Sequence, residues 1–330
     1  MIWGWQNKLF KNKYLRCILG IALSVTATSY AQQFPSRPLR IVVGYTSGGA
    51  VDFTARLIGT KLTEALSQPV VVENRPGATT AIATERVATA APDGYTLLLI
   101  PTSTAIQSAL RNNLPYDLKR DFAPVSQLAS GAFALVVHPS LPIKTVKELI
   151  AYAREQPGKL STGSPGLGSA NHLAGELFNL RSRVNILHVP YNGSSEAVVA
   201  VASAQTQMSL PSTASVLPLI EAGKVRVLAV SSIKRVSSLP HVPTLDESGV
   251  NGYEYTVWYG ISAPGAVPKP ILKQLNVVLG RIVQLPDVKA AFQKQGMESQ
   301  AGTPEQFAAM ITREVEQTVK LLQVAGIKAE

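Results

Sequence analysis

The chain has 330 residues, of which 46% are hydrophobic and 16% charged, and its formal net charge is +10. This length and apolar content allow a sizeable buried core and exclude a disordered or low-complexity chain. Residues 1–31 carry four charges, all basic (Lys8, Lys11, Lys13 and Arg16), so +10 − 4 leaves +6 on the remainder. Because the remaining Lys and Arg are scattered, we expect no nucleic-acid-binding face.

Residues 1–31 have the organisation of a secretory signal peptide. A basic segment over residues 1–16 precedes the apolar stretch Cys17–Ala27, and Ser29-Tyr30-Ala31 places small residues at positions −3 and −1 of a cleavage site. The apolar stretch is shorter than the roughly 20 residues of a membrane-spanning helix, which disfavours a retained anchor. We therefore expect a periplasmic protein. Its mature chain has no cysteine, because Cys17 is the single one.

Apolar runs alternate with segments of helical periodicity from Phe34 onward, which predicts an α/β fold with mostly parallel sheets and helices on both faces. We expect strands over residues 39–43, 70–73, 95–100, 133–137, 185–189 and 225–230, and helices over 52–66, 79–90, 145–156, 169–180 and 195–204. The tail over 268–325 is predicted to be helical with breaks at Pro286 and at residues 302–304, where Thr303 and Gln306 are spaced as a capping box.

The chain from Phe34 onward is too long for one comfortable core, yet no long polar linker divides it. Two lobes joined by more than one short crossover fit this better than two consecutive domains. Candidate crossovers lie around Gln127–Ala132 and Asn251–Thr256.

Four segments rich in glycine and hydroxyl groups each follow a predicted strand and precede a predicted helix. They cover residues 44–49, 101–104, 162–169 and 191–195, and none contains Lys, Arg, Asp or Glu. In α/β sheets such segments form the ligand crevice, where glycine allows close approach of backbone N–H groups and helix N-termini attract anions. The segments together indicate a site that holds a small anion, such as a carboxylate, by neutral hydrogen bonds. Taken singly, each also fits ordinary turn and capping chemistry.

The sequence does not match the glycine- and serine-containing motifs of nucleotide-binding and catalytic sites. The glycines at 163, 166 and 168 do not have the dinucleotide-binding spacing, and no Gly-x-Ser-x-Gly elbow is present. The four histidines have no zinc-binding spacing. His172 and Asp52 could face a ligand, although both fit equally a role in stabilising the first turn of a helix. We therefore expect a binding protein with no enzymatic activity, no metal site and no cofactor.

Several segments resemble the extracytoplasmic solute receptors of tripartite tricarboxylate transporters, the TctC-like or Bug-type receptors. The more specific ones are VENRPGA at residues 72–78, PDGYTLL at 92–98 and the stretch from Val225 to Tyr253. The similarity runs from about Phe34 to Lys328.

This resemblance implies a two-lobed type II periplasmic-binding-protein fold with a ligand cleft between the lobes and two hinge crossovers. Lobe 1 would comprise residues 34–131 plus 255–330, and lobe 2 residues 132–254. In the family a carboxylate is held by backbone amides and hydroxyl groups from both lobes. Carried over by position, the ligand-binding residues would be Tyr45, Thr46, Gly48, Gly49, Ser103 and Thr104 in lobe 1, and Ser164, Gly166, Gly168, Ser169, Gly193 and Ser194 in lobe 2.

Some positions depart from the pattern of the family. Thr46-Ser47 stands where relatives usually have prolines, Asn192 where they often have Lys, and Pro211 where an Asp or Asn is often found. The run Ser203–Gln207 replaces a Gly-Gly-Gln-Val-Asp sequence. These changes remove charge near the expected cleft, so they bear on which acid is bound.

The resemblance implies a monomeric receptor that delivers a small organic acid to the membrane permease subunits of a tripartite tricarboxylate transporter. A ligand sensor that presents its closed form to a membrane histidine kinase is an alternative with the same fold. A hydrolase is a third possibility, disfavoured by the missing nucleophile and base.

Export predicts that protein recovered from the periplasm begins at Gln32, because signal peptidase cleaves after the small residue at position −1. N-terminal sequencing or intact-mass measurement checks this. An intact Met1 on the periplasmic protein would contradict it.

Overall fold

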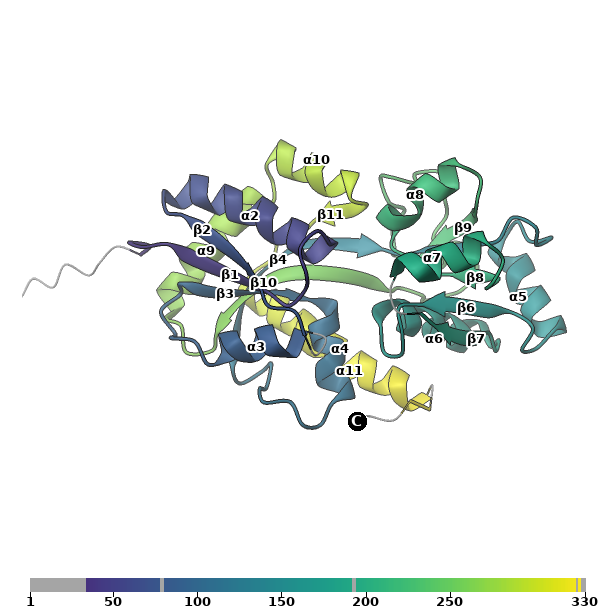
Figure 1. The fold of residues 1–330 in the computed structure, drawn as a ribbon, viewed down its shortest axis with the longest axis horizontal. Coiled ribbons are helices and arrows are strands. Elements are labelled where there is room, and N and C mark those ends of the chain that lie inside the picture. The colour runs from purple at the N-terminus through teal and green to yellow at the C-terminus, as the bar shows by residue number, and fades with distance from the viewer. Residues whose placement is uncertain (1–33, 78–79, 192–193, 325, 328–330) are drawn as a thin grey trace, which may run out of the picture. The chain divides into compact units, whose positions relative to one another are not determined.

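A computed structural model describes residues 34–77, 80–191, 194–324 and 326–327 (Figure 1). The predicted signal peptide and its cleavage site lie outside these ranges. Residues from Arg37 onward form one compact unit. Within the described ranges, no helix combines the length and apolar character that crossing a membrane requires.

The first sheet has six strands in the order β11-β4-β10-β3-β1-β2. Its strands are β1 (Leu39–Val43), β2 (Val70–Asn74), β3 (Thr96–Pro101), β4 (Phe122–Ala132), β10 (Thr256–Pro264) and β11 (Met297–Ser299). The helices associated with it are α2 (Ala50–Leu66), α3 (Ala81–Ala88), α4 (Thr102–Leu110), α9 (Lys269–Ile282), α10 (Pro286–Lys294) and α11 (Pro304–Val324). Helices α2 and α9 pack against each other, whereas α3, α4 and α11 share a core cluster on the sheet (Figure 1).

The second sheet has five strands in the order β7-β6-β8-β5-β9. They are β5 (Ala134–Val137), β6 (Ser161–Ser164), β7 (Leu187–Pro190), β8 (Met208–Ser209) and β9 (Arg226–Val230). The helices of this half are α5 (Val146–Glu155), α6 (Ala170–Ser182), α7 (Ser194–Ala202) and α8 (Thr213–Glu221). Its main core cluster includes the fully buried ring of Tyr253, whose hydroxyl donates to the Ala174 carbonyl at 2.8 Å.

The chain passes between the sheets twice. The first passage is at Phe133, between β4 and β5, and the second lies between β9 and β10. Strands β4 and β10 pair antiparallel from Thr256 opposite Ala132 to Pro264 opposite Phe122. The two connections therefore leave the first sheet side by side. The α/β two-sheet fold with two crossovers is the one expected, while the lobe boundaries at 131/132 and 254/255 stay a prediction.

The expectation of mostly parallel sheets was wrong. Strand β1 is parallel to β2 and β3, and β6 is parallel to β7 and β8, but the pairs that involve β4, β5 or β10 are antiparallel. The strands next to the crossovers cannot follow the βαβ pattern, because they enter a sheet from the other half of the molecule rather than over a helix. The first candidate crossover, Gln127–Ala132, is accordingly part of β4.

The capping box predicted at residues 303–306 is confirmed. The Thr303 backbone N–H donates to Gln306 Oε1 at 2.9 Å, and the Gln306 backbone N–H donates to Thr303 Oγ1 at 3.2 Å. This reciprocal pair begins α11, the helix that packs on both β4 and α6.

Gly260 of β10 lies directly beneath α11, and we expect Gly260→Ala to destabilise the fold strongly. An added Cβ would lie 2.1 Å from Phe307 Cζ and 2.8 Å from the Ser126 carbonyl oxygen. Overpacking of this kind costs about 1–3 kcal/mol or more. The matched control is Gly280→Ala in α9, where a Cβ meets nothing within 4 Å; it should stabilise by about 0.5–1 kcal/mol through helix propensity. Urea denaturation measures both, and equal midpoints would contradict this packing.

Candidate functional site

The lobe 1 residues predicted to bind ligand lie where two neighbouring parallel strands end. Strands β1 and β3 are adjacent and parallel, so the starts of α2 and α4 fall at the same edge of the sheet. Residues 44–49 connect β1 to α2 as expected, but Thr102–Thr104 form the first turn of α4 rather than a loop. Neither helix has a side-chain hydrogen bond at its N-cap, Gly49 or Pro101. Both N-termini therefore leave first-turn N–H groups available at this edge.

Two hydroxyl pairs join the segments of this edge. Tyr45 Oη and Ser103 Oγ are 2.7 Å apart, and Thr80 Oγ1 and Thr104 Oγ1 are 3.1 Å apart. Burial raises the pKa of Tyr45, although the bond with Ser103 opposes this, so its hydroxyl stays protonated. Gly44 permits the approach of Thr80, since a Cβ there would lie 2.8 Å from Thr80 Cβ. The structure thus brings Tyr45 together with Ser103, while Thr46, Gly48 and Gly49 lie exposed beside them.

A buried carboxylate that the sequence left ambiguous organises the first segment. Asp52 is 3% exposed, and its Oδ2 accepts from the Gly48 backbone N–H and from Arg56 Nε, both at 2.9 Å. Its Oδ1 accepts from Asn74 Nδ2 at 2.9 Å. Burial alone would raise the pKa of Asp52, but the hydrogen bonds from Arg56, Gly48 and Asn74 together lower it. Asp52 therefore holds the loop before α2 as a carboxylate.

The second-lobe residues lie at the ends of β6 and β7, which are also parallel neighbours. Ser164 ends β6, and Ser169 is the N-cap of α6, where its Oγ accepts from the His172 backbone N–H at 3.2 Å. Ser164 Oγ accepts from the Gly166 backbone N–H at 3.3 Å, and Ser169 Oγ lies 3.4 Å from Ser164 Oγ. Gly193 and the side chain of Ser194 lie outside the described residues. Ser164, Gly166 and Ser169 are thus brought together.

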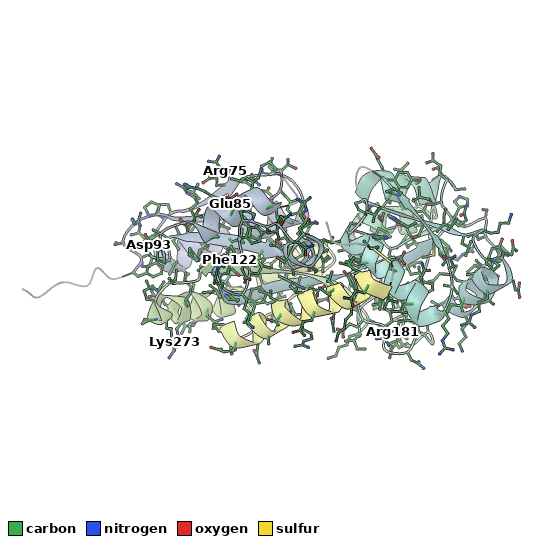
Figure 2. All side chains as sticks on the ribbon, turned by 90° about the horizontal axis from the view of Figure 1, so that it is seen from below. Arg75, Glu85, Asp93, Phe122, Arg181 and Lys273 are labelled. Carbon is green, nitrogen blue, oxygen red and sulfur yellow. The ribbon has the colours of Figure 1, made fainter. Side chains whose placement is uncertain are left out.

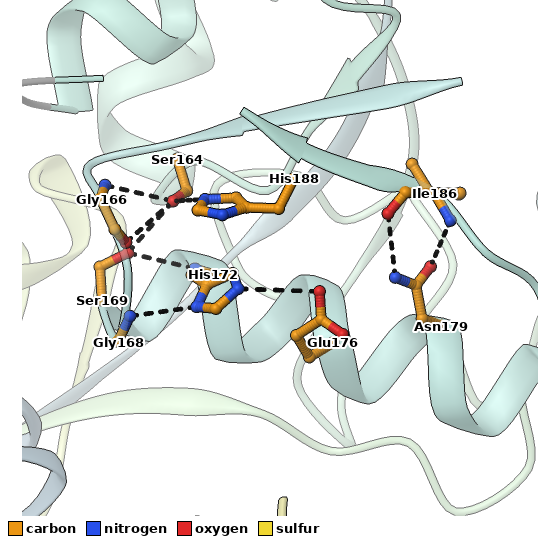
Figure 3. A network of polar contacts seen from close by, with 9 residues as sticks. All are labelled: Ser164, Gly166, Gly168, Ser169, His172, Glu176, Asn179, Ile186 and His188. Atoms are coloured by element: carbon orange, nitrogen blue, oxygen red, sulfur yellow. Dashed lines mark hydrogen bonds and ion pairs between the residues drawn. The ribbon is translucent and has the colours of Figure 1, made fainter. Parts of the chain in front are cut away.

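Two stacked imidazoles support this segment (Figure 3). The rings of His172 and His188 have centroids 3.9 Å apart. His188 Nε2 is 2.6 Å from Ser164 Oγ, and His172 Nδ1 accepts from the Gly168 backbone N–H at 3.1 Å. Because Nδ1 of His172 accepts, neutral His172 carries its proton on Nε2, which lies 3.7 Å from Glu176 Oε1.

Both histidines are neutral at physiological pH. Burial, together with the nearby His188, lowers the pKa of His172 to about 4. Burial also lowers the pKa of His188 and raises that of Glu176. The pair beneath the loop therefore adds hydrogen-bonding capacity without positive charge. The sequence suggested the helix role of His172, but gave no signal for His188, which lies in β7, whereas His172 lies in α6.

The amides of Gly48, Gly166 and Gly168 already have partners within their own segments, namely Asp52, Ser164 and His172. Gly168 has a second constraint, because it has φ +71° and a Cβ there would lie 2.5 Å from Leu110 Cδ1 of α4. This places the second-lobe loop against a helix of the first sheet. Within the described ranges, no hydrogen bond joins the first-lobe site residues to those of the second lobe.

The Ser164–His188 contact has the distance of a nucleophile and its base, but its setting is not catalytic. Ser164 is 1% exposed, and no described carboxylate bonds to His188 to orient the ring. The described residues also contain no group of three or more His, Cys, Asp or Glu side chains placed to hold a metal ion. Two α/β sheets joined by two crossovers, with helix starts and neutral hydroxyl groups at neighbouring strand ends in each sheet, are the features of a solute-binding protein with the type II periplasmic-binding-protein fold.

Comparison with known proteins places the chain in a family. The family model described as "Tripartite tricarboxylate transporter family receptor" matches residues 54–327. The chain is 39% identical over 312 residues to the "UPF0065 protein in tcbD-tcbE intergenic region" of Pseudomonas sp. (strain P51), covering 93% of each. It is 34% identical over 311 residues to "Protein BugT" of Bordetella pertussis, covering 94% of each. The chain belongs to the TctC family of Bug-type solute receptors, and it is a binding protein rather than an enzyme.

Two solved structures of similar fold have ligands in their descriptions. "R. palustris Rpa4515 with adipate" matches with a TM-score of 0.78 and 35% identity, covering 89% of this chain and 99% of that one. "MatC (Rpa3494) from Rhodopseudomonas palustris with bound malate" matches with a TM-score of 0.73 and 29% identity, covering 88% and 100%. Other solved relatives are described as a periplasmic transporter and a periplasmic binding protein.

The lowered histidine pKa values predict that the fold loses stability in mild acid. In the unfolded chain His172 binds a proton below its ordinary pKa of about 6.5. In the folded protein it becomes protonated only when the pH falls to about 4. Stability should therefore fall as pH drops through this window and be unaffected by His172 above pH 7. His172→Asn retains an acceptor for Gly168 and should show a smaller decrease in Tm between pH 7 and 4.5. His241→Asn, at an exposed histidine, should behave as the wild type. Identical pH profiles for all three proteins would contradict this assignment.

Proposed function

We propose that the protein is a periplasmic receptor that binds a small dicarboxylate between its two lobes and delivers it to the permease subunits of a tripartite tricarboxylate transporter. The observation that carries this proposal is the arrangement of helix starts. Helices α2 and α4 begin at one edge of the first sheet, and α6 and α7 begin after neighbouring strands of the second. Such N-termini bind anions through N–H groups and the helix dipole.

The twelve residues predicted from the sequence form the proposed site. The uncapped first turns of α2 and α4 can donate to a carboxylate without losing an existing bond. Tyr45 and Ser103 can add hydroxyl groups from the same edge. The backbone N–H groups of Gly48 and Gly168 would first have to break their hydrogen bonds to Asp52 and His172 before they could donate to the ligand. We therefore expect the Gly49 backbone N–H and the hydroxyl groups of Tyr45 and Ser103 to contribute most of the binding free energy.

A dicarboxylate is favoured because of the solved relatives, one described with adipate and another with malate. A ligand with two carboxylates could contact both sets of helix starts, one at each end. The two crossovers at Phe133 and before β10 would allow the lobes to close on it. The proposed lobes are residues 34–131 plus 255–330 and residues 132–254, and the proposed receptor is a monomer.

The test begins with native mass spectrometry of the purified protein, which is expected to show a co-purifying organic acid. Titration calorimetry with adipate and malate should then give saturable binding by at least one of them. Because the proposed donors are neutral and become enclosed, affinity should change little between low and moderate salt. A steep salt dependence would mean that a Lys or Arg side chain enters the site.

Gly168→Ala provides a residue-level test of the same site. Alanine is strained at φ +71°, and its Cβ would lie 2.5 Å from Leu110 Cδ1, so we expect the loop backbone to relax and adipate or malate binding to weaken at least tenfold. The matched control is Gly158→Ala, with φ +74° but nothing within 4 Å of the added Cβ. Gly158→Ala should lose about 1 kcal/mol of stability from backbone strain alone and should bind as the wild type; Gly168→Ala should lose more, because of the added contact with Leu110. Equal affinities in the two variants would overturn the placement of the site.

A further inference from the structure

A cavity of about 1130 Å³ lies away from the proposed carboxylate site and contains none of its twelve residues. Its floor comes from the ends of β4 and β10 next to the crossovers. One wall comes from β11 and the C-terminal half of α11, both of the first sheet. The other comes from the end of α6 and from residues 232–240, both of the second half. Figure 2 shows α11 extending toward the second half, where Arg181 is labelled near its end.

The buried part of the cavity lining contains polar atoms that lack partners. The hydroxyls of Tyr255 and Ser299 are buried, and neither has a hydrogen-bond partner in the described part of the chain. Leaving such groups unpaired is unfavourable, and native proteins do it rarely. Beside them, Trp258 Nε1 donates to Glu314 Oε2 at 3.4 Å, and burial raises the pKa of Glu314. The buried part of the lining thus contains hydroxyl groups, an indole and a carboxyl group.

The walls of the cavity are apolar and partly exposed to solvent. Leu177 and Leu180 of α6 face the cavity together with Leu321 and Val324 of α11. Leu180 is 44% exposed and Val324 62% exposed, so part of this apolar surface is open to solvent.

The rim is predominantly basic. Arg181, Lys234, Arg313 and Lys320 line it, all four are exposed, and none forms an ion pair within the described ranges. Two of the acidic groups in the cavity are already engaged, because Glu298 accepts from Ser237 and Glu314 from Trp258. The rim therefore favours an anionic group, and the walls favour an apolar body.

We propose that this cavity is a second binding site, for an amphipathic organic acid whose anionic group lies at the rim formed by Arg313 and Lys320 and whose apolar body packs along Leu180 and Val324. The site would be spatially separate from the carboxylate site, with which it shares no lining residue. Since its walls come from both halves and its floor from the crossover strands, its occupant contacts parts that move relative to each other in any hinge motion. Binding here is consequently coupled to the opening and closing of the protein.

The first experiment titrates the purified protein with 8-anilinonaphthalene-1-sulfonate, which combines an aromatic body with a sulfonate, and then displaces it with octanoate. The double variant Arg313→Glu/Lys320→Glu should weaken dye binding at least tenfold. The matched control, Lys273→Glu/Lys289→Glu, reverses two exposed charges outside the cavity and should change it less than twofold. Equal binding by both double variants, or no binding by the wild type, overturns the proposal.

A second variant separates ligand contact from damage to the fold. Leu180 is 44% exposed, so Leu180→Asn should leave the unliganded protein nearly as stable as the wild type. Octanoate or dye affinity should nevertheless fall about fivefold, because the apolar body loses an apolar contact. Leu187→Asn, at a 50% exposed residue of β7 outside the cavity, is the control. Unchanged affinity in Leu180→Asn contradicts the proposed position of the apolar body.

Hydrogen exchange with octanoate present locates the site directly. Protection is expected in residues 232–240, in 254–258 and in the C-terminal half of α11, and not in residues 44–49 or 164–169. Protection confined to those last two segments would mean that octanoate occupies the carboxylate site, and would overturn the second site while leaving the proposed receptor function intact. Conversely, if no dicarboxylate binds but octanoate gives the expected protection, the proposed receptor function is wrong and the second site is supported.

Discussion

Ser231 ties together the two segments that connect the halves of the molecule. It is fully buried; its Oγ accepts from the Phe133 backbone N–H at 2.8 Å and donates to the Tyr255 carbonyl at 2.5 Å. Its own backbone N–H donates to the Phe133 carbonyl and its carbonyl accepts from the Tyr255 N–H, both at 2.9 Å. One residue thus bonds to both crossovers. Because these groups are buried, breaking the bonds would leave unpaired polar atoms, so the crossovers behave as one unit.

These bonds mean that the proposed hinge motion would be confined to the same few residues. The strands on the two sides of these residues have different surroundings: β4 and β10 are paired over nine residue positions in the first sheet, whereas Phe133 leads at once into β5. The ring of Phe133 packs on that of Tyr255 with centroids 6.1 Å apart. A hinge at this point would keep each sheet intact and change the spacing of the surfaces that flank the crossovers. The proposed carboxylate site and the proposed second site, the cavity lined by β4, β10, α6 and α11, both depend on those surfaces.

Charge is arranged so that the proposed carboxylate site stays neutral. Asp52 is negative but is bonded to Arg56, Asn74 and the Gly48 amide, and the stacked His172 and His188 are uncharged because of their burial. The groups that remain available are helix N-termini and hydroxyls, which bind an anion without requiring a counter-charge to be desolvated. Reversible capture and release are compatible with such a site, since no buried ion pair has to be broken when the ligand leaves.

The sequence by itself determined the family, the α/β class and the segments that follow the strands. These are local properties: the glycine and hydroxyl runs lie next to apolar stretches, and the capping box at Thr303 and Gln306 depends on four consecutive residues. Only the tertiary structure decided that β4, β5 and β10 pair antiparallel, that α4 begins at Thr102, and that His188 supports Ser164. It also brought Tyr255, Glu314 and Arg181 to one cavity, although they are separated by scores of residues. Such partners are set by how strands from distant parts of the chain share a sheet, and residue periodicity carries no record of that pairing.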